Sequence, residues 1–111
     1  MIAAVFALGA MIILATAARV PTINVEPACR AFAERVAPIA DLETCIRRES
    51  AAREQLVRKW QQFAAEDKSH CLSLSSTGGK PTYTELLTCL ELQRDARNLR
   101  QKERATTGQG R

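Results

Sequence analysis

The residues of this chain best suited to chemistry are four cysteines, Cys29, Cys45, Cys71 and Cys89, and the single histidine, His70. A thiolate beside an imidazole can bind a metal ion or act as a nucleophile. The spacing argues against both uses, because the chain has no CxxC or HxxxH pair and the gaps between cysteines are long. A lone histidine near a helix end more often interacts with the last carbonyls of that helix. We therefore predict no catalytic residue, no metal site and no cofactor, and we do not expect an enzyme.

Disulfide bonds explain the cysteines better. An even set of cysteines in a chain of 111 residues, behind an export-like segment, is typical of a disulfide framework. A chain of this size buries a modest core, so two crosslinks of about 2 to 4 kcal/mol each are a large share of its stability. We therefore predict an oxidised domain that is periplasmic or secreted.

Residues 1–18 form an uncharged apolar segment, MIAAVFALGAMIILATAA. Its end, Ala15-Thr16-Ala17, fits the small-residue pattern that a signal peptidase accepts. No Lys or Arg precedes the apolar run, Arg19 follows it, and its length of about 17 residues is just enough to span a bilayer. A cleaved signal peptide and an uncleaved anchor in the inner membrane, with the domain in the periplasm, both remain open.

The net charge of +4 is concentrated at the C-terminus. Up to Gln93 the chain has ten basic and ten acidic residues, whereas residues 94–111 have six basic and two acidic ones. Such a segment can contact anionic lipid or an acidic protein surface; nucleic acid is an unlikely partner for an exported protein without a recognition helix. The candidate binding residues are Arg94, Arg97, Arg100, Lys102 and Arg104.

The elements that must position these residues are helices. After a linker, residues 19–26, Pro27 can occupy the first turn of a short helix that Pro38 closes. Asp41 can cap a second helix that runs to about Lys68 without Gly or Pro, with a break permitted near residues 64–65. Its apolar stripe comprises Leu42, Cys45, Ile46, Ala52, Leu56, Val57, Trp60, Phe63 and Ala64.

A loop and a further helix follow. Residues 73–81 are rich in Ser, Gly and Pro and predict a loop, in which Gly78-Gly79 is a turn rather than a phosphate-binding motif. Thr82 and Glu85 can form a capping box, so a helix begins at residue 82 or 83. Its predicted apolar face comprises Leu86, Cys89, Leu92 or Gln93, Ala96 and Leu99, and residues 106–111 should fray.

Helix geometry restricts the pairing of the cysteines. Cys45 and Cys71 would be about 39 Å apart on one continuous helix, whereas a disulfide needs α-carbons about 6 Å apart. If the chain folds back about Thr77, Cys45 and Cys89 lie about 30 Å apart along the helix axis, which is also too far for a disulfide. The pairs that remain are Cys29 with Cys45 and Cys71 with Cys89.

Helical spacing also places Trp60 and Phe63 in the interface between the two helices, so we expect them in the core rather than in an aromatic binding surface.

The segments CIRRESAAREQLVRKWQQFAAEDKSHC and GGKPTYTELLTCLELQRDAR resemble a family of small exported four-cysteine proteins of alphaproteobacteria. The resemblance covers about Cys29 to Leu99 and is most specific at Gly78-Gly79 and at residues 83–91. It implies export and a disulfide-stapled helical fold, and it carries no catalytic or binding residues. The uncharged start of this chain departs from the family pattern.

These features together predict an all-α domain, residues 27–105, with a flexible tail at 106–111. A long helix and a second helix form a disulfide-closed hairpin, a short extra helix is stapled to its base, and a signal or anchor helix precedes the domain. The expected function is a non-catalytic envelope protein that binds another protein. The alternative is a single-pass accessory subunit of an inner-membrane complex.

Overall fold

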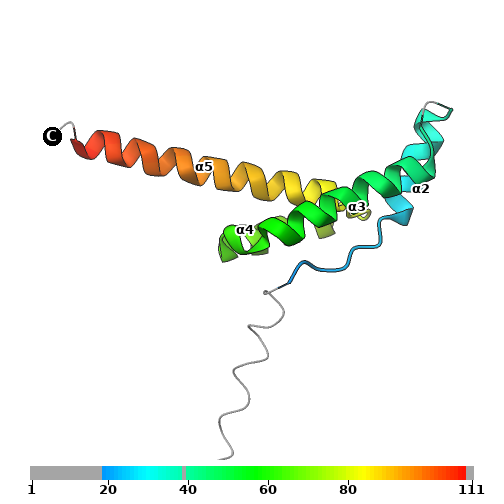
Figure 1. Cartoon of the computed structure of the whole chain (residues 1–111), viewed down its shortest axis with the longest axis horizontal. Helices are drawn as coiled ribbons and strands as arrows, with labels where there is room; N and C mark the ends of the chain where they lie inside the picture. Colours follow the sequence, from blue (N-terminus) through cyan, green and yellow to red (C-terminus); the bar gives the residue numbers. More distant parts are fainter. Residues whose placement is uncertain (1–18, 39, 110–111) are drawn as a thin grey trace, which may run out of the picture.

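The computed structural model describes residues 19–38 and 40–109, and this part of the chain is helical without strands. The elements are α2 (Glu26–Val36), α3 (Leu42–Lys59), the short 3-10 helix η1 (Trp60–Gln62), α4 (Ala65–Thr77) and α5 (Tyr83–Gln109) (Figure 1). The all-α prediction is therefore confirmed. The predicted signal or anchor helix, residues 1–18, lies outside the described residues.

Local capping sets the ends of the first two helices. Pro27 lies in the first turn of α2, which ends at Val36, shortly before Pro38. The carboxylate of Asp41 accepts the backbone N–H of Thr44 at 2.8 Å and caps α3. This bond to the charged form is the main reason why the pKa of Asp41 is lowered from its ordinary value of 3.8. Both sequence predictions of helix starts are confirmed.

The predicted long helix at 41–68 is interrupted. α3 stops at Lys59, one turn of 3-10 helix follows, and Phe63 and Ala64 are extended before α4 begins. Trp60 and Phe63 are both buried, and the extended backbone after η1 lets the chain reverse while both rings stay in the core. His70 and Cys71 consequently lie in the middle of α4 rather than at the edge of a loop.

The predicted loop at 73–81 is too long. Residues 73–77 are the last part of α4, where each hydroxyl of Ser75, Ser76 and Thr77 donates to the carbonyl three residues earlier. These side chains satisfy carbonyls near the helix end, so the serines do not break the helix. The connection is reduced to residues 78–82, where Gly79 takes a positive φ of 78°.

α5 packs against both α3 and α4, which run in opposite directions relative to it. Glu49 and Lys59 of α3 contact Thr84 and Glu91 of α5 in the same order, so α3 and α5 run parallel. Asp67 of α4 meets Arg97 and Cys71 meets Cys89, so α4 and α5 run antiparallel. The predicted two-helix hairpin is therefore a three-helix arrangement, with α2 attached to α3 (Figure 1).

Both predicted disulfides are present. Cys29 is bonded to Cys45 and Cys71 to Cys89, with α-carbon separations of 5.5 and 5.7 Å. The first joins α2 to the start of α3, and the second closes the α4–α5 pair. Two disulfides indicate an oxidising, extracytoplasmic compartment.

The core differs in part from the predicted apolar stripes. Ile46 and Val57 of α3, and Leu92 and Leu99 of α5, are exposed although the spacing placed them inside. α5 instead packs through a face shifted toward Leu87 and Leu90. The buried core comprises Ala52, Leu56, Trp60, Phe63, Cys71, Tyr83, Leu86, Leu87 and Leu90, so the prediction that the aromatic residues lie in the core is confirmed.

The segment before α2 is also packed. Val20, Ile23 and Val25 are partly buried against the core, and the backbone N–H of Ile23 donates to the hydroxyl of Tyr83 at 2.8 Å. Three residues of the predicted linker, residues 19–26, therefore pack on the domain.

Candidate functional site

Glu49 is a buried carboxylate at the junction of α3 and α5. It is 6% exposed, and one of its oxygens accepts the backbone N–H groups of Tyr83 at 2.7 Å and Thr84 at 3.2 Å. Its other oxygen accepts the hydroxyl of Thr84. The N-terminus of α5 thus receives a cap from another helix, in addition to the predicted bond from the Glu85 amide to the Thr82 hydroxyl at 3.1 Å. We assign Glu49 a structural role.

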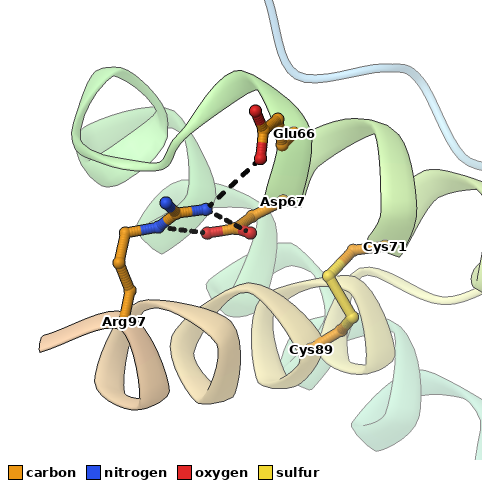
Figure 2. Close-up of polar contacts among 5 residues, drawn as sticks. All are labelled: Glu66, Asp67, Cys71, Cys89 and Arg97. Carbon is orange, nitrogen blue, oxygen red and sulfur yellow. Dashed lines mark hydrogen bonds and ion pairs between the residues drawn. A yellow bond between two sulfur atoms is a disulfide. The ribbon is translucent and has the colours of Figure 1, made fainter. Parts of the chain in front are cut away.

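Arg97, a predicted binding residue, is engaged inside the fold. Its guanidinium donates to both oxygens of Asp67, at 2.9 and 3.3 Å, and lies 4.0 Å from Glu66 (Figure 2). The hydrogen bonds that Arg97 donates to Asp67 are the main reason why the pKa of Arg97 is raised above its ordinary value. Figure 2 shows this group and the Cys71–Cys89 disulfide side by side along the α4–α5 pair.

The five predicted basic residues do not form one surface. Arg94 lies over the ring of Phe63, 5.5 Å from its centroid, and Arg97 is bonded to α4. Arg100, Lys102 and Arg104 are exposed on the end of α5 that extends past the other helices (Figure 1). Residues 106–109, predicted as flexible tail, continue this helix. Of these five cations, only the last three are classed as exposed.

A surface formed by Leu74 of α4 and by Leu92 and Leu99 of α5 is apolar and open; we call it the leucine surface. These side chains are 54%, 64% and 60% exposed. Leu92 and Leu99 are seven residues apart, so they share one face of α5. Leu74 and Leu92 line a shallow groove of about 450 Å³ together with Thr84, Glu85, Thr88, Cys89 and Gln93.

A second concave site lies where α2, α3 and the start of α5 meet; we call it the α2 pocket. It has a volume of about 320 Å³, and its apolar side is Ala28, Ala31 and Phe32. Arg48 lies over the ring of Phe32, 5.9 Å from its centroid. The other lining residues are Arg35, Cys45, Glu49, Lys80, Thr82, Thr84 and Glu85.

The described residues were also searched for metal-ligand clusters and for membrane-spanning helices. In residues 19–38 and 40–109, no three His, Cys, Asp or Glu side chains lie together as metal ligands would. His70 is exposed on α4, and the sulfur of its neighbour Cys71 is in a disulfide. No helix in the same part of the chain has the length and hydropathy needed to cross a bilayer.

The sequence interpretation missed Glu49 and the α2 pocket. A signal for Glu49 is present, because Cys45, Glu49, Ala52 and Leu56 follow one helical face, and a carboxylate on an apolar face requires a partner. No comparable signal exists for the pocket, whose walls come from four separate segments.

Comparisons of the chain with protein-family models, with curated proteins and with solved structures found no match.

Proposed function

We propose that this protein is a non-catalytic interaction module of the cell envelope, located in the periplasm, that binds a protein partner through the leucine surface. The observation that carries the proposal is the groove that exposed Leu74 of α4 and Leu92 of α5 line across the disulfide-closed pair, with exposed Leu99 seven residues further along α5. Single exposed leucines are ordinary, but aligned ones mark docking sites. Covering one leucine fully contributes about 1.5 to 3 kcal/mol.

The partner element that fits this surface is an amphipathic helix. Leu92 and Leu99 form a narrow seam along α5, and Leu74 widens it into a groove at one end. Helices dock on such grooves through residues at i, i+3, i+4 and i+7. Charged residues of both signs, Asp95, Lys102 and Glu103, lie beside the seam and can set the direction of the partner helix.

The site is built on a rigid support. Cys89 lines the groove and is bonded to Cys71. Further along α5, Arg97 forms an ion pair with Asp67 of α4. A surface that is already ordered loses little conformational entropy on binding. The disulfide therefore contributes to affinity as well as to stability.

The test is site-specific crosslinking in the native envelope. A photoreactive residue at position 92 should give one crosslinked protein, identified by mass spectrometry. Leu74→Asp and Leu92→Asp should each reduce co-purification of that protein at least about tenfold, because a charge in a covered apolar contact costs more than about 1.4 kcal/mol.

Val57→Asp is the matched control. Val57 is 54% exposed, as Leu74 is, but it lies on α3 outside the leucine surface. Equal loss of the partner with this variant, or no loss with the two leucine variants, contradicts the proposal. Circular dichroism and the intact mass of the disulfide-bonded protein confirm that each variant is folded.

The second candidate is a single-pass accessory subunit of an inner-membrane complex, and the packing of Val20 favours it. Only Arg19 separates Ala18 from this packed residue. If residues 1–18 are retained, the domain is therefore held close to the bilayer, where Arg100, Lys102 and Arg104 can meet anionic lipid. N-terminal sequencing distinguishes the candidates: a start at residue 18 or 19 in the soluble fraction supports the periplasmic module, and a retained segment that resists carbonate extraction supports the subunit.

A further inference from the structure

The α2 pocket combines unpaired positive charge with an apolar side. Arg35 extends from α2, Arg48 from α3 and Lys80 from the loop before α5, and all three line the same pocket. In the described part of the structure none of the three is in an ion pair. Three cations from three segments thus lie around one concavity without forming an ion pair.

Two acidic residues, Glu49 and Glu85, also line the pocket, so its lining carries three positive and two negative charges. Both oxygens of Glu49 already accept hydrogen bonds from Tyr83 and Thr84. Glu85 is exposed, as the three cations are, and it forms no ion pair with them. The amides of the first turn of α5 are partly taken up by Glu49 and by Thr82, so the two guanidinium groups and the Lys80 ammonium are the charged donors left for a ligand.

The apolar side of the pocket is small. Ala28, Ala31, Phe32 and Arg35 recur at three- and four-residue steps and so form one face of α2, with the alanines leaving room beside the Phe32 ring. Arg48, which lies over that ring, is held with its guanidinium at the pocket edge. A volume of about 320 Å³ suits a group the size of one or two residues rather than a helix.

We infer that the α2 pocket binds a carboxylate that carries a short aliphatic group, with the carboxylate between Arg35, Arg48 and Lys80 and the aliphatic part against α2. Arginine forks match the two oxygens of a carboxylate. The α2 pocket shares Thr84 and Glu85 with the groove of the leucine surface but contains none of its leucines, so this inference does not depend on the proposed function. A free small acid and the C-terminal residue of a polypeptide share this chemistry.

The experiment is an NMR titration of the oxidised protein recovered from the envelope, with N-acetyl-leucine as the probe. Amide shifts should centre on Ala28, Phe32, Arg48 and Lys80. N-acetyl-leucinamide, which lacks the charge, and acetate, which lacks the aliphatic group, should each bind at least about tenfold more weakly.

The variant Arg35→Gln/Arg48→Gln should weaken N-acetyl-leucine binding about fivefold or more, because it removes two of the three cations. Arg58→Gln, an exposed arginine of α3 outside the pocket, should leave binding unchanged. All three arginines are exposed, so the fold should survive, and circular dichroism checks this.

A further pair of probes identifies the source of the ligand. A hexapeptide ending in leucine with a free C-terminus that binds at least about tenfold more tightly than N-acetyl-leucine indicates a polypeptide terminus; equal binding indicates a free acid. The inference is overturned if the neutral amide binds as well as the acid, if the shifts lie elsewhere, if the double variant binds normally, or if no probe binds at about 10 mM.

Discussion

Two buried carboxylates show how single residues hold the helices of this protein together. Glu49 of α3 accepts hydrogen bonds from the start of α5, and Asp67 of α4 is bonded to Arg97 further along α5. They are the only charged residues that are buried in the described ranges 19–38 and 40–109, and each is paired with a group on α5. A buried carboxylate without such partners would cost several kcal/mol.

Replacement of Glu49 by Ala should lower the free energy of unfolding by about 1 to 3 kcal/mol. The change leaves the buried amide of Tyr83 and that of Thr84 without their acceptor. Urea denaturation followed by circular dichroism measures the loss. Glu54→Ala, an exposed glutamate on the same helix, is the control and should change stability by less than about 0.5 kcal/mol.

Asp41 should make the stability pH-dependent in the acid range. Because the pKa of Asp41 is lower in the folded protein than its ordinary value of 3.8, its contribution is complete above that value and is lost as the pH falls through the lowered pKa. Asp41→Asn keeps a capping side chain that does not titrate. Unfolding curves between pH 5 and pH 2 should therefore fall less steeply for this variant, and equal slopes for the two proteins would contradict the assignment.

At the scale of elements, the two disulfides have different neighbours. Cys71 belongs to the core and Cys89 packs against it, so their bond fixes α4 on the central helix. Cys29 is buried where α2 meets α3, outside that core cluster. The Cys71–Cys89 disulfide therefore belongs to the three-helix core, and the Cys29–Cys45 disulfide attaches a peripheral helix.

Removing the disulfides one at a time should separate these roles. Cys71→Ser/Cys89→Ser should lower the global free energy of unfolding by about 3 kcal/mol, as expected for a loop with a sequence separation of 18. Cys29→Ser/Cys45→Ser should instead accelerate amide hydrogen exchange in α2 while α5 keeps its protection. Equal loss of protection in α2 and α5 would show that α2 is part of the same cooperative unit.

At the scale of the whole molecule, α5 is the helix that the others share. Its first part contacts α3 and α4, and residues 98–108 are exposed beyond them (Figure 1). Because these residues are exposed, this end gains little packing energy from the domain, and an isolated helix of this length is marginal in water.

Deletion of residues 101–111 should change the free energy of unfolding by less than about 0.5 kcal/mol, because residues 101–108 are exposed. The Arg97 bonds and the core remain intact in this variant. Chemical denaturation and circular dichroism measure the effect. A loss above about 1 kcal/mol would show that the end of α5 is packed in solution, in contrast to the structure.

Several features were determined by sequence alone because they depend on neighbouring residues. Pro27 and Asp41 begin helices through local capping, and the Thr82 hydroxyl accepts the Glu85 amide as predicted. The cysteine pairing also followed, although the long helix was broken. The distance argument assumed one continuous helix through residue 60, which the structure does not have; the pairing holds because α2 brings Cys29 to Cys45 and α4 brings Cys71 to Cys89.

Only the tertiary structure decided which faces are covered, because that depends on contacts between residues far apart in the chain. Helical spacing could not distinguish Leu90, which is buried, from Leu92, which is exposed, until α5 was placed between α3 and α4. The same placement engages Arg97 and leaves Arg100 open. The α2 pocket is formed by four segments whose approach no local pattern encodes, so its cations become a site only when the chain has folded.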